Sequence, residues 1–237
     1  MKKAYITGAT GAIGMALVDE LLKNGISTTV FLRKGSGRND RVKDSFSGEL
    51  ASGLLRIEYV SLEELSGYAM SRNTQDMQTY ASQDLLTKAA GGADTAVFYH
   101  LGWSGTFGEQ RNNADMQQKN VEYALDAVRL AKRLGCVHFI GVGSQAEYGR
   151  FEGRLTPDTR TLPENEYGMA KLAAGIRSAE LCRELGLRHS WVRVLSVYGP
   201  FDGRNTMIMS VFRGLFSGGG VALTKGEQIW NYLYSGD

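Results

Sequence analysis

The feature that most constrains the fold of this chain is a glycine-rich segment near its start. Gly8, Gly11 and Gly14 follow the apolar run 4–6, and an amphipathic stretch at 15–24 comes directly after them. With 30 glycines in 237 residues, chance yields about half an occurrence of this spacing per chain, so its position is what matters. A turn between strand and helix brings unpaired N–H groups toward an anion. The segment predicts a pyrophosphate-binding turn, the alternative being a glycine-rich turn without a ligand.

Strand and helix patterns alternate along the rest of the chain. Apolar or β-branched runs predict strands at 4–6, 28–32, 54–60, 94–100, 137–142 and 189–197. Helical periodicity predicts helices at 15–24, 115–134, within 163–185 and at 207–216, while 33–44 is expected to be a loop and 61–92 helical. This alternation is typical of an α/β fold, a Rossmann-type doubly wound parallel sheet.

Charge and cysteine content exclude several classes of function. A formal net charge of +2 leaves no electrostatic footprint for nucleic acid or an anionic membrane. No run approaches the ~20 apolar residues that a membrane span requires, and no His/Cys/Asp cluster has metal-ligand spacing. Cys136 and Cys182 do not make a disulfide framework. We therefore expect a cytoplasmic protein with no nucleic-acid, membrane or metal partner.

The end of the second predicted strand bears on which dinucleotide would bind. NAD-binding domains carry an acidic residue there, which contacts the ribose hydroxyls. This chain has Arg33 and Lys34, then Ser36 and Arg38, and no carboxylate follows the strand until Asp40. Two cations beside a hydroxyl suit a 2′-phosphate. The sequence favours NADP(H), and NAD(H) stays open because a solvated basic loop is the alternative.

A tyrosine, a lysine and a serine form a candidate catalytic set. Tyr167 and Lys171 are four residues apart in a predicted helix and so share a face. A lysine cation ~5 Å from the phenol, at an effective dielectric of ~20, would lower its pKa by roughly 2 units. Ser144 follows the fifth predicted strand, at the sheet edge where such folds bind ligands. The alternative is an ordinary surface pair on a helix.

Taken together, these motifs resemble the extended short-chain dehydrogenase/reductases, the group called NAD-dependent epimerases/dehydratases. The matching segments are TGATGAIG at 7–14, HLGW at 100–103, NV at 120–121, GSQAEYG at 143–149, YGMAK at 167–171 and RVLSVYGP at 193–200. The resemblance implies that Tyr167 is the acid/base, Lys171 holds the nicotinamide ribose and Ser144 positions the substrate oxygen. It further implies a cofactor site lined by Gly8, Thr10, Gly11, Ala12, Ile13, Gly14, Arg33, Lys34, Leu101, Gly102, Trp103, Asn120, Val142 and Val197.

One departure from the family concerns dehydration. Dehydratases of this group carry an Asp-Glu pair directly after the Ser/Thr, where this chain has Gln145 and Ala146. An amide and a methyl group cannot do general acid/base work, so dehydration is disfavoured. Glu147 comes one step later and should face the other way on an extended chain. It is a second candidate acid/base or substrate contact, with a structural ion pair as the alternative.

Other departures concern the substrate. Trp230 stands where the family often has an arginine that binds the substrate diphosphate, and an indole would stack on a base or sugar instead. Ser196 stands where many epimerases have asparagine, and Arg111 lies in a loop that could reach substrate. The chain also ends earlier than family members usually do. We expect residues 1–195 to bind NAD(P) and 196–237 to begin a substrate-binding portion that is small and incomplete.

The resemblance implies an NAD(P)-dependent epimerase or 4-ketoreductase of a nucleotide-linked sugar. Two alternatives stay open: a dinucleotide-binding regulatory protein without turnover, and a reductase of a non-nucleotide carbonyl. A homodimer is expected by analogy, through the helix ending near Leu134 and the Tyr167 helix, although the outer faces of both are mixed.

Overall fold

The core of the protein is one parallel β-sheet. The computed structural model describes residues 1–71, 95–227 and 230–237. The sheet contains β1 (Lys3–Thr7), β2 (Ser27–Leu32), β3 (Leu55–Tyr59), β4 (Ala96–His100), β5 (Cys136–Ser144) and β6 (Arg188–Val194). Their order is β3-β2-β1-β4-β5-β6, and all neighbours pair in parallel. The strand order reverses between β1 and β4, so the prediction of a doubly wound parallel sheet is confirmed.

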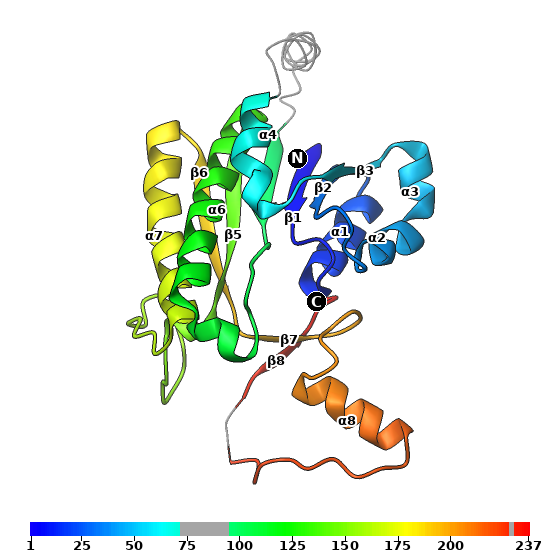
Figure 1. Cartoon of the computed structure of the whole chain (residues 1–237), viewed down its shortest axis with the longest axis vertical. Coiled ribbons are helices and arrows are strands. Elements are labelled where there is room, and N and C mark those ends of the chain that lie inside the picture. The colour runs from blue at the N-terminus through cyan, green and yellow to red at the C-terminus, as the bar shows by residue number, and fades with distance from the viewer. Residues whose placement is uncertain (72–94, 228–229) are drawn as a thin grey trace.

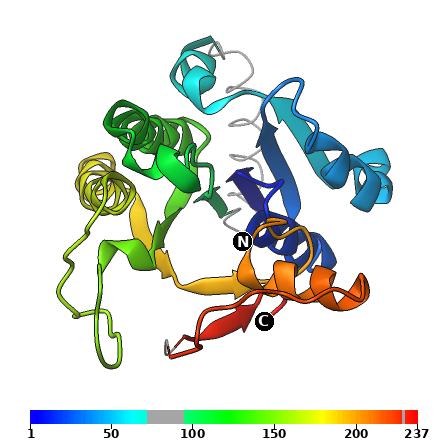
Figure 2. The ribbon, with the colours of Figure 1, turned by 60° about the horizontal axis from the view of Figure 1, so that its bottom comes forward.

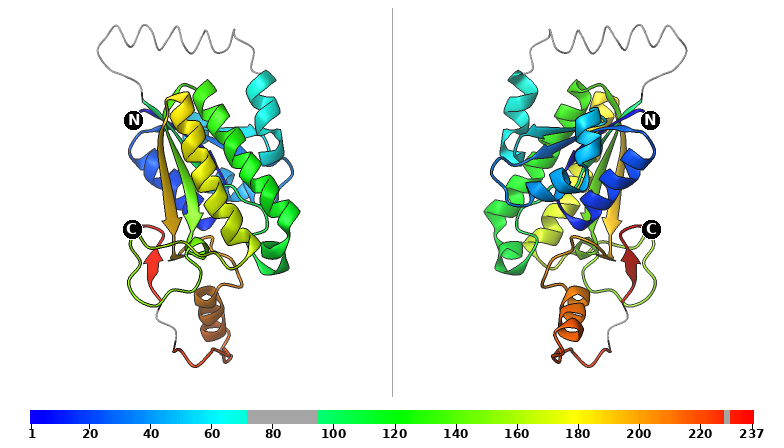
Figure 3. Two further views of the ribbon diagram at one scale, coloured as in Figure 1. Left: turned by 90° about the vertical axis from the view of Figure 1, so that its left-hand side faces the viewer. Right: turned by 90° about the vertical axis from the view of Figure 1, so that its right-hand side faces the viewer.

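Helices cover both faces of this sheet. The α-helices are α1 (Ala12–Lys23), α2 (Asn39–Ser45), α3 (Ser47–Ser52), α4 (Leu65–Ser71), α6 (Ala114–Arg133), α7 (Glu166–Leu185) and α8 (Met207–Phe216). Short 3₁₀ turns are η1 (Leu62–Glu64), η2 (Gly108–Asn112) and η3 (Gln145–Glu147). Helices α4, α6 and α7 lie on one face and α1, α2 and α3 on the other (Figures 1 and 3). Residues 72–94, which include most of the segment 61–92 predicted to be helical and the first residue of the strand predicted at 94–100, lie outside the described residues.

Each face of the sheet has its own hydrophobic core, as expected where strands are buried on both sides. Toward α1, alternate residues such as Ala4, Ile6 and Val30 are buried in one cluster. Toward α6 and α7, aromatic rings from β2, β4 and β5 line up across the sheet. The centroids of Phe31 and Phe98, and of Phe98 and Phe139, are 5.9 Å apart. The continuous apolar runs of the sequence therefore supply side chains to the hydrophobic cores on both faces of the sheet.

Two segments differ from the sequence prediction on the β2 side. Helix α1 begins at Ala12 rather than at residue 15, because the apolar periodicity starts a turn later than the helix does. Residues 33–44, expected to be a loop, contain most of α2. The helical signal there was weak because α2 buries only Asn39 and Val42.

The predicted strand at 189–197 is two strands in different sheets. β6 ends at Val194, and β7 (Ser196–Tyr198) pairs in parallel with β8 (Tyr232–Tyr234) to form a second sheet. The apolar run continues across Leu195, so the pattern did not reveal the break. Figure 2 shows β7, β8 and α8 beyond the carboxyl end of the main sheet. Helix α8 matches its predicted range and exposes apolar side chains, Phe216 at 88%.

Candidate functional site

A cavity of about 580 Å³ lies where β1, β2, β3 and β4 end. Its walls come from the loops that follow these strands, at the carboxyl edge where open α/β sheets bind ligands. The lining residues include Gly8, Thr10, Arg33, Ser36, Arg38, Ser61, Glu63, Gly102, Trp103 and Phe107. Sequence reasoning missed Ser61 and Glu63. The rule that loops after parallel strands meet at one edge would have pointed to them.

The glycine turn forms one wall of this cavity. Gly8 has φ +77°, and a Cβ there would lie 2.6 Å from backbone atoms of Leu101 and Gly102. A Cβ on Gly14 would lie 2.3 Å from the Gly8 carbonyl oxygen, so only glycine lets α1 approach the turn. A Cβ on Gly11 would meet nothing closer than 3.8 Å. Internal packing therefore does not require a glycine at position 11, and the absence of a side chain there leaves space beside the turn.

The amino end of α1 has no acceptor from the chain's own N-cap side chain, because Gly11 occupies that position. Helix N-termini with free N–H groups attract anions. Together with the bare turn and the adjoining cavity, this end of α1 fits the pyrophosphate of a dinucleotide. Ala12 and Ile13 form the first turn of α1, at the point where such a group would approach.

The basic residues after β2 divide between the cavity and the protein surface. Arg33, Ser36 and Arg38 line the cavity, whereas Lys34 does not. Hydrogen bonds from Ser61 lower the pKa of the Glu64 carboxyl, and the charge of Lys34 contributes to this shift. Lys34 is therefore near Glu64 rather than in the cavity wall.

Two buried amides hold the loop after β4. Asn120 is 1% exposed, and its side chain both donates to the Ser104 carbonyl and accepts from the Ser104 N–H, each at 2.9 Å. Gln117 donates to the Gly105 carbonyl at 2.9 Å and accepts from the Trp103 indole at 2.8 Å. Asn120, which was expected to line the cofactor site, instead holds Ser104, and Ser104 lines the cavity. Gln117 holds Trp103 and Gly105 in the same way, a role that the sequence did not reveal.

Leu101, also expected to line the site, packs against the apolar cluster under α1. Gly102 and Trp103, the next two residues, do line the cavity. The loop therefore turns outward directly after Leu101.

The structure brings Ser144, Tyr167 and Lys171 together. Ser144 ends β5, and its side chain lies close enough to the Tyr167 phenol to lower the pKa of that phenol. Tyr167 and Lys171 lie on α7, which is capped by Asn165, whose side chain accepts from the Gly168 N–H at 2.8 Å. The three side chains thus come from the end of one strand and the first turns of one helix.

The lysine is buried beneath Trp103. Lys171 is 3% exposed, and its Nζ donates to the Val142 carbonyl at 2.7 Å. Nζ also lies 3.7 Å from the centroid of the Trp103 ring and 5.9 Å from that of Tyr167. Burial lowers the pKa of Lys171 to about 7, a shift that the charge of Glu147 opposes.

The pKa of the Tyr167 phenol is raised, whereas the spacing to Lys171 predicted a lowered pKa. Burial raises the pKa of the Tyr167 phenol, and Glu147 contributes in the same direction. The groups that lower it are the Ser144 side chain and the charge of Arg111. The lysine ammonium is desolvated and directed toward the Val142 carbonyl, with its Nζ 5.9 Å from the centroid of the phenol ring.

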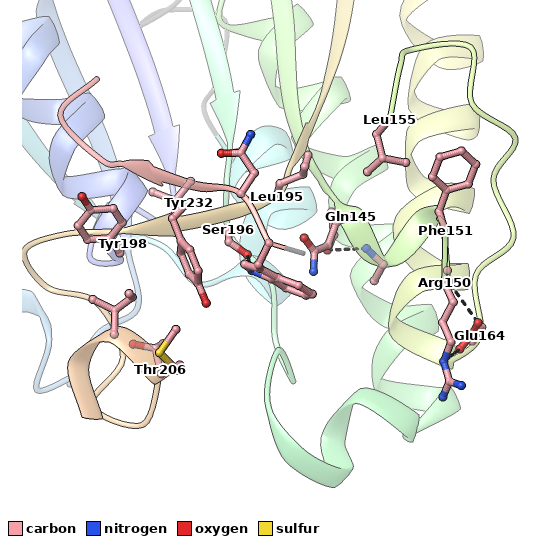
Figure 4. A pocket seen from close by; sticks show the side chains of 18 of the residues that line it. Gln145, Arg150, Phe151, Leu155, Glu164, Leu195, Ser196, Tyr198, Thr206 and Tyr232 are labelled. Carbon is pink, nitrogen blue, oxygen red and sulfur yellow. Dashed lines mark hydrogen bonds and ion pairs between the residues drawn. The ribbon is translucent and has the colours of Figure 1, made fainter. Parts of the chain in front are cut away.

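A second cavity of about 1000 Å³ adjoins Ser144. Its lining includes Arg111, Ser144, Gln145, Ala146, Arg150, Phe151, Arg154, Ser196, Val197, Tyr198, Thr206, Trp230 and Tyr232. In Figure 4, Gln145 lies between Ser196 and the loop that carries Arg150 and Phe151, with the Arg150–Glu164 ion pair at the outer end. The Trp230 indole hydrogen-bonds the Ser196 hydroxyl. Ser196 and Trp230, which are far apart in the sequence and were both predicted to contact substrate, therefore meet in this wall.

Sequence reasoning missed the 150–155 loop and the tyrosines of the second sheet. The loop follows β5 and η3, so its position after a parallel strand was the available signal. Tyr198 and Tyr232 lie on strands whose pairing joins residues far apart in the chain, and no local pattern announces such a contact.

Glu147 is a structural residue and does not line the cavity. It is fully buried, and its carboxylate accepts from the Ser144 N–H at 2.8 Å, the Trp191 indole at 3.0 Å and Arg193 Nε at 2.7 Å. Residues 145–147 form a 3₁₀ turn rather than an extended segment. The turn directs the carboxylate back under Ser144, which leaves it without access to a substrate.

Within the described part of the chain, no group of three or more His, Cys, Asp or Glu side chains could hold a metal ion. None of the helices in those residues is both long and apolar enough to cross a bilayer.

Solved structures share this architecture. The chain is similar to UDP-glucuronic acid 4-epimerase from Bacillus cereus in complex with UDP-glucuronic acid and NAD (TM-score 0.72, 18% identity, 98% of this chain and 69% of that chain covered). It is also similar to UDP-N-acetylglucosamine 4-epimerase from Methanobrevibacter ruminantium M1 in complex with UDP-N-acetylmuramic acid (0.75, 19%, 99% and 69%). A third similar structure is dTDP-glucose 4,6-dehydratase from Bacillus anthracis str. Ames in complex with NAD (0.73, 17%, 99% and 68%).

A comparison with curated proteins finds no match. The sequence itself matches the NAD dependent epimerase/dehydratase family over residues 4–237. This match covers nearly the whole chain and includes the glycine turn and the Ser144, Tyr167 and Lys171 set. The chain belongs to the NAD-dependent epimerase/dehydratase family.

Proposed function

We propose that this protein oxidises and re-reduces a hydroxyl-bearing carbon of a nucleotide-linked sugar, with epimerisation at that carbon as the net reaction. The observation that carries this proposal is the proximity of the Ser144 and Tyr167 side chains, with Ser144 lining the larger cavity. Phe107 lines both cavities, and Trp103, which lines the smaller one, packs edge-on against the Tyr167 ring.

The catalytic roles follow from the chemistry of the two hydroxyl groups. Tyr167 Oη takes the proton from the substrate hydroxyl and returns it, while Ser144 Oγ hydrogen-bonds the developing oxyanion. Lys171 supplies positive charge beside the cofactor ribose once its Nζ turns from the Val142 carbonyl. When bound, the nicotinamide supplies the hydride acceptor and donor.

The proposed cofactor site uses the smaller cavity. The glycine turn and the first turn of α1 hold the pyrophosphate, and Gly102 and Trp103 bound the nicotinamide side. Val197 lines the larger cavity instead, and the Val142 carbonyl holds Lys171. Residues 1–195 then form the cofactor-binding part and 196–237 the substrate-binding part, a division supported by the change of sheet between Val194 and Ser196.

The larger cavity suits a sugar nucleotide in size and lining. Drug-sized ligands occupy sites of ~300–1,000 Å³, with aromatic walls and a few polar groups. Trp230 and Tyr232 offer rings on which a base or sugar can stack. Arg150 and Arg154 supply cations for a diphosphate, in the absence of the arginine that Trp230 replaces.

Two residues that line the larger cavity disfavour dehydration. Gln145 and Ala146 line the cavity directly after Ser144, where elimination of water would need an acid and a base. An amide and a methyl group can position a substrate but cannot transfer its protons.

A second candidate function is NADPH-dependent 4-ketoreduction. The observation in its favour is that Arg33, Ser36 and Arg38 line the cofactor cavity together. This group could bind a 2′-phosphate, which NAD lacks. A reductase would consume NADPH in proportion to product, whereas an epimerase would use NAD without net consumption.

The test is to incubate the chain with NAD and UDP-glucose or UDP-glucuronic acid, and separately with NADPH and a 4-keto sugar nucleotide. Products are identified by NMR, and cofactor is followed by absorbance. A new epimer without net NADH supports epimerisation, and NADPH consumption with a reduced sugar supports the second candidate. Failure of both reactions, with the cofactor bound, would overturn both functions.

A further inference from the structure

The loop after β4 places an arginine against the ring of the proposed catalytic tyrosine. Arg111 belongs to η2, and its guanidinium carbon lies 4.4 Å from the centroid of the Tyr167 ring. The side chain is partly buried and lines the larger cavity together with Ser144. Gln117 fixes the approach of η2 by donating to the Gln110 carbonyl at 3.0 Å.

Arg111 has no carboxylate partner among the residues that the structure describes. Arg150, in the same cavity wall, pairs with Glu164 at 3.3 Å, and Arg193 pairs with Glu147 at 2.7 Å. Arg111 instead meets the face of an aromatic ring. A guanidinium over a ring face is attracted by the ring's negative face, and more strongly if the ring itself carries charge.

The groups around Tyr167 differ in how they affect its phenol. Lys171, on the same helix, has its Nζ on the Val142 carbonyl and 5.9 Å from the phenol centroid. Glu147, from η3, disfavours the phenolate, but its charge is paired with Arg193. The Ser144 side chain, from β5, favours the phenolate. Among the described residues, Arg111 is therefore the cation nearest the ring, 4.4 Å from its centroid, and it has no carboxylate partner there.

We propose that Arg111 is a positioning residue for Tyr167, whose stacked guanidinium stabilises the phenolate and holds the ring for proton transfer. This inference deepens the proposed function and rests on it, because it assigns a role at the same tyrosine. In the usual arrangement suggested by Tyr-x-x-x-Lys spacing, the lysine alone would supply this charge.

The physical reason is the permanence of the arginine charge. A guanidinium stays protonated throughout the range in which proteins fold. The ammonium of Lys171, with a pKa of about 7, loses its charge as the pH rises through neutrality. Arg111 lowers the pKa of Tyr167 against the effect of burial, so it keeps the phenolate accessible when the lysine is neutral.

The first arm of the test needs no substrate. Alkaline titration of the whole chain is followed by the ultraviolet absorption of phenolate, and the curve of Tyr167→Phe is subtracted to isolate Tyr167. We expect Arg111→Gln to raise the midpoint by about one pH unit, and Arg111→Lys to restore most of the shift. Arg129→Gln, which removes an exposed arginine paired with Asp126 on α6, is the matched control and should leave the midpoint unchanged.

The second arm measures turnover against pH with a UDP-sugar. The acid limb of kcat should move up by about one pH unit in Arg111→Gln, so that turnover on that limb falls about tenfold. A rise in KM with the kcat profile unmoved would instead make Arg111 a substrate anchor and overturn the proposal.

An unchanged Tyr167 midpoint in Arg111→Gln would also overturn it, as would a parent whose Tyr167 stays protonated until the chain unfolds. If the parent shows no turnover, the proposed function fails while the titration still decides the role of Arg111. Thermal unfolding of each variant verifies that the fold is intact.

Discussion

Replacing Lys171 with methionine should stabilise the fold while abolishing turnover. The lysine is 3% exposed, and burial lowers its pKa from an ordinary value of 10.5 to about 7. Between these two pH values the unfolded chain binds more protons at this site than the folded chain does. The free energy of unfolding therefore rises with pH across this window, by up to ~1.4 kcal/mol per pH unit. Below pH 7 the penalty is complete, and above 10.5 it is absent.

The magnitude follows from the size of this pKa difference. At ~1.36 kcal/mol per pKa unit, the buried charge costs on the order of 4–5 kcal/mol near pH 7 and about 2 kcal/mol at pH 9. Methionine removes this cost but leaves the Val142 carbonyl without its donor, which costs ~1–3 kcal/mol at any pH. We expect Lys171→Met to be more stable than the parent by about 2 kcal/mol at pH 7 and roughly equal to it at pH 9.

The assay is urea unfolding of parent and variant at pH 6, 7, 8 and 9, followed by tryptophan fluorescence. The diagnostic quantity is the difference in unfolding free energy as a function of pH, since packing changes affect all pH values alike. Lys132→Met, an exposed lysine on α6, is the control and should change stability by less than ~0.5 kcal/mol. A difference between Lys171→Met and the parent that is the same at pH 6 and pH 9 would refute the reasoning.

Three further predictions concern the turn, the buried ion pair and the basic loop. Gly14→Ala should destabilise the fold by more than ~2 kcal/mol, because its Cβ would lie 2.3 Å from a carbonyl oxygen. Gly11→Ala should fold normally but bind NAD at least ~10-fold more weakly in calorimetry. Glu147→Ala should cost ~3–5 kcal/mol in urea unfolding, because it leaves Arg193 without its buried partner, whereas Asp126→Ala, from an exposed pair, should cost less than ~1 kcal/mol. Arg33→Ala should weaken NADPH binding and leave NADH binding unchanged, and equal effects on both cofactors would exclude recognition of a 2′-phosphate.

Much of the fold could be predicted because the relevant patterns are local. Buried parallel strands appear as apolar runs, and long helices such as α6 show their periodicity over many turns. The glycine turn combines three positions with a strand before it and a helix after it. Segments with little buried surface, such as α2, carried too weak a pattern to be recognised.

One local signal was present and was misinterpreted. Ser144 and Glu147 have the S-x-x-E spacing of a capping box, and the structure shows both of its hydrogen bonds. The spacing predicted a turn at this position. On an extended segment Glu147 could have been an acid/base or a substrate contact, whereas in the turn it forms the ion pair with Arg193 that was the alternative.

The remaining differences arise from contacts between distant parts of the chain. Arg111 and Tyr167 meet because η2 packs against the start of α7, and Trp103 reaches Lys171 because Gln117 holds its indole. Helical spacing places Lys171 on the same face as Tyr167, but it does not reveal the carbonyl and ring that surround the ammonium. The electrostatics of the site therefore required the structure.

The most direct test of this account is rapid mixing of the NAD-bound chain with a UDP-sugar, in the parent and in Tyr167→Phe. The absorbance of NADH reports oxidation of the sugar, and calorimetry establishes that both proteins bind NAD equally. The account predicts NADH formation in the parent and a loss of at least ~100-fold in rate in the variant. Equal rates in the two proteins, or no NADH in a parent that binds both ligands, would contradict the assignment of Tyr167 as the proton-transfer group of a sugar-nucleotide oxidation.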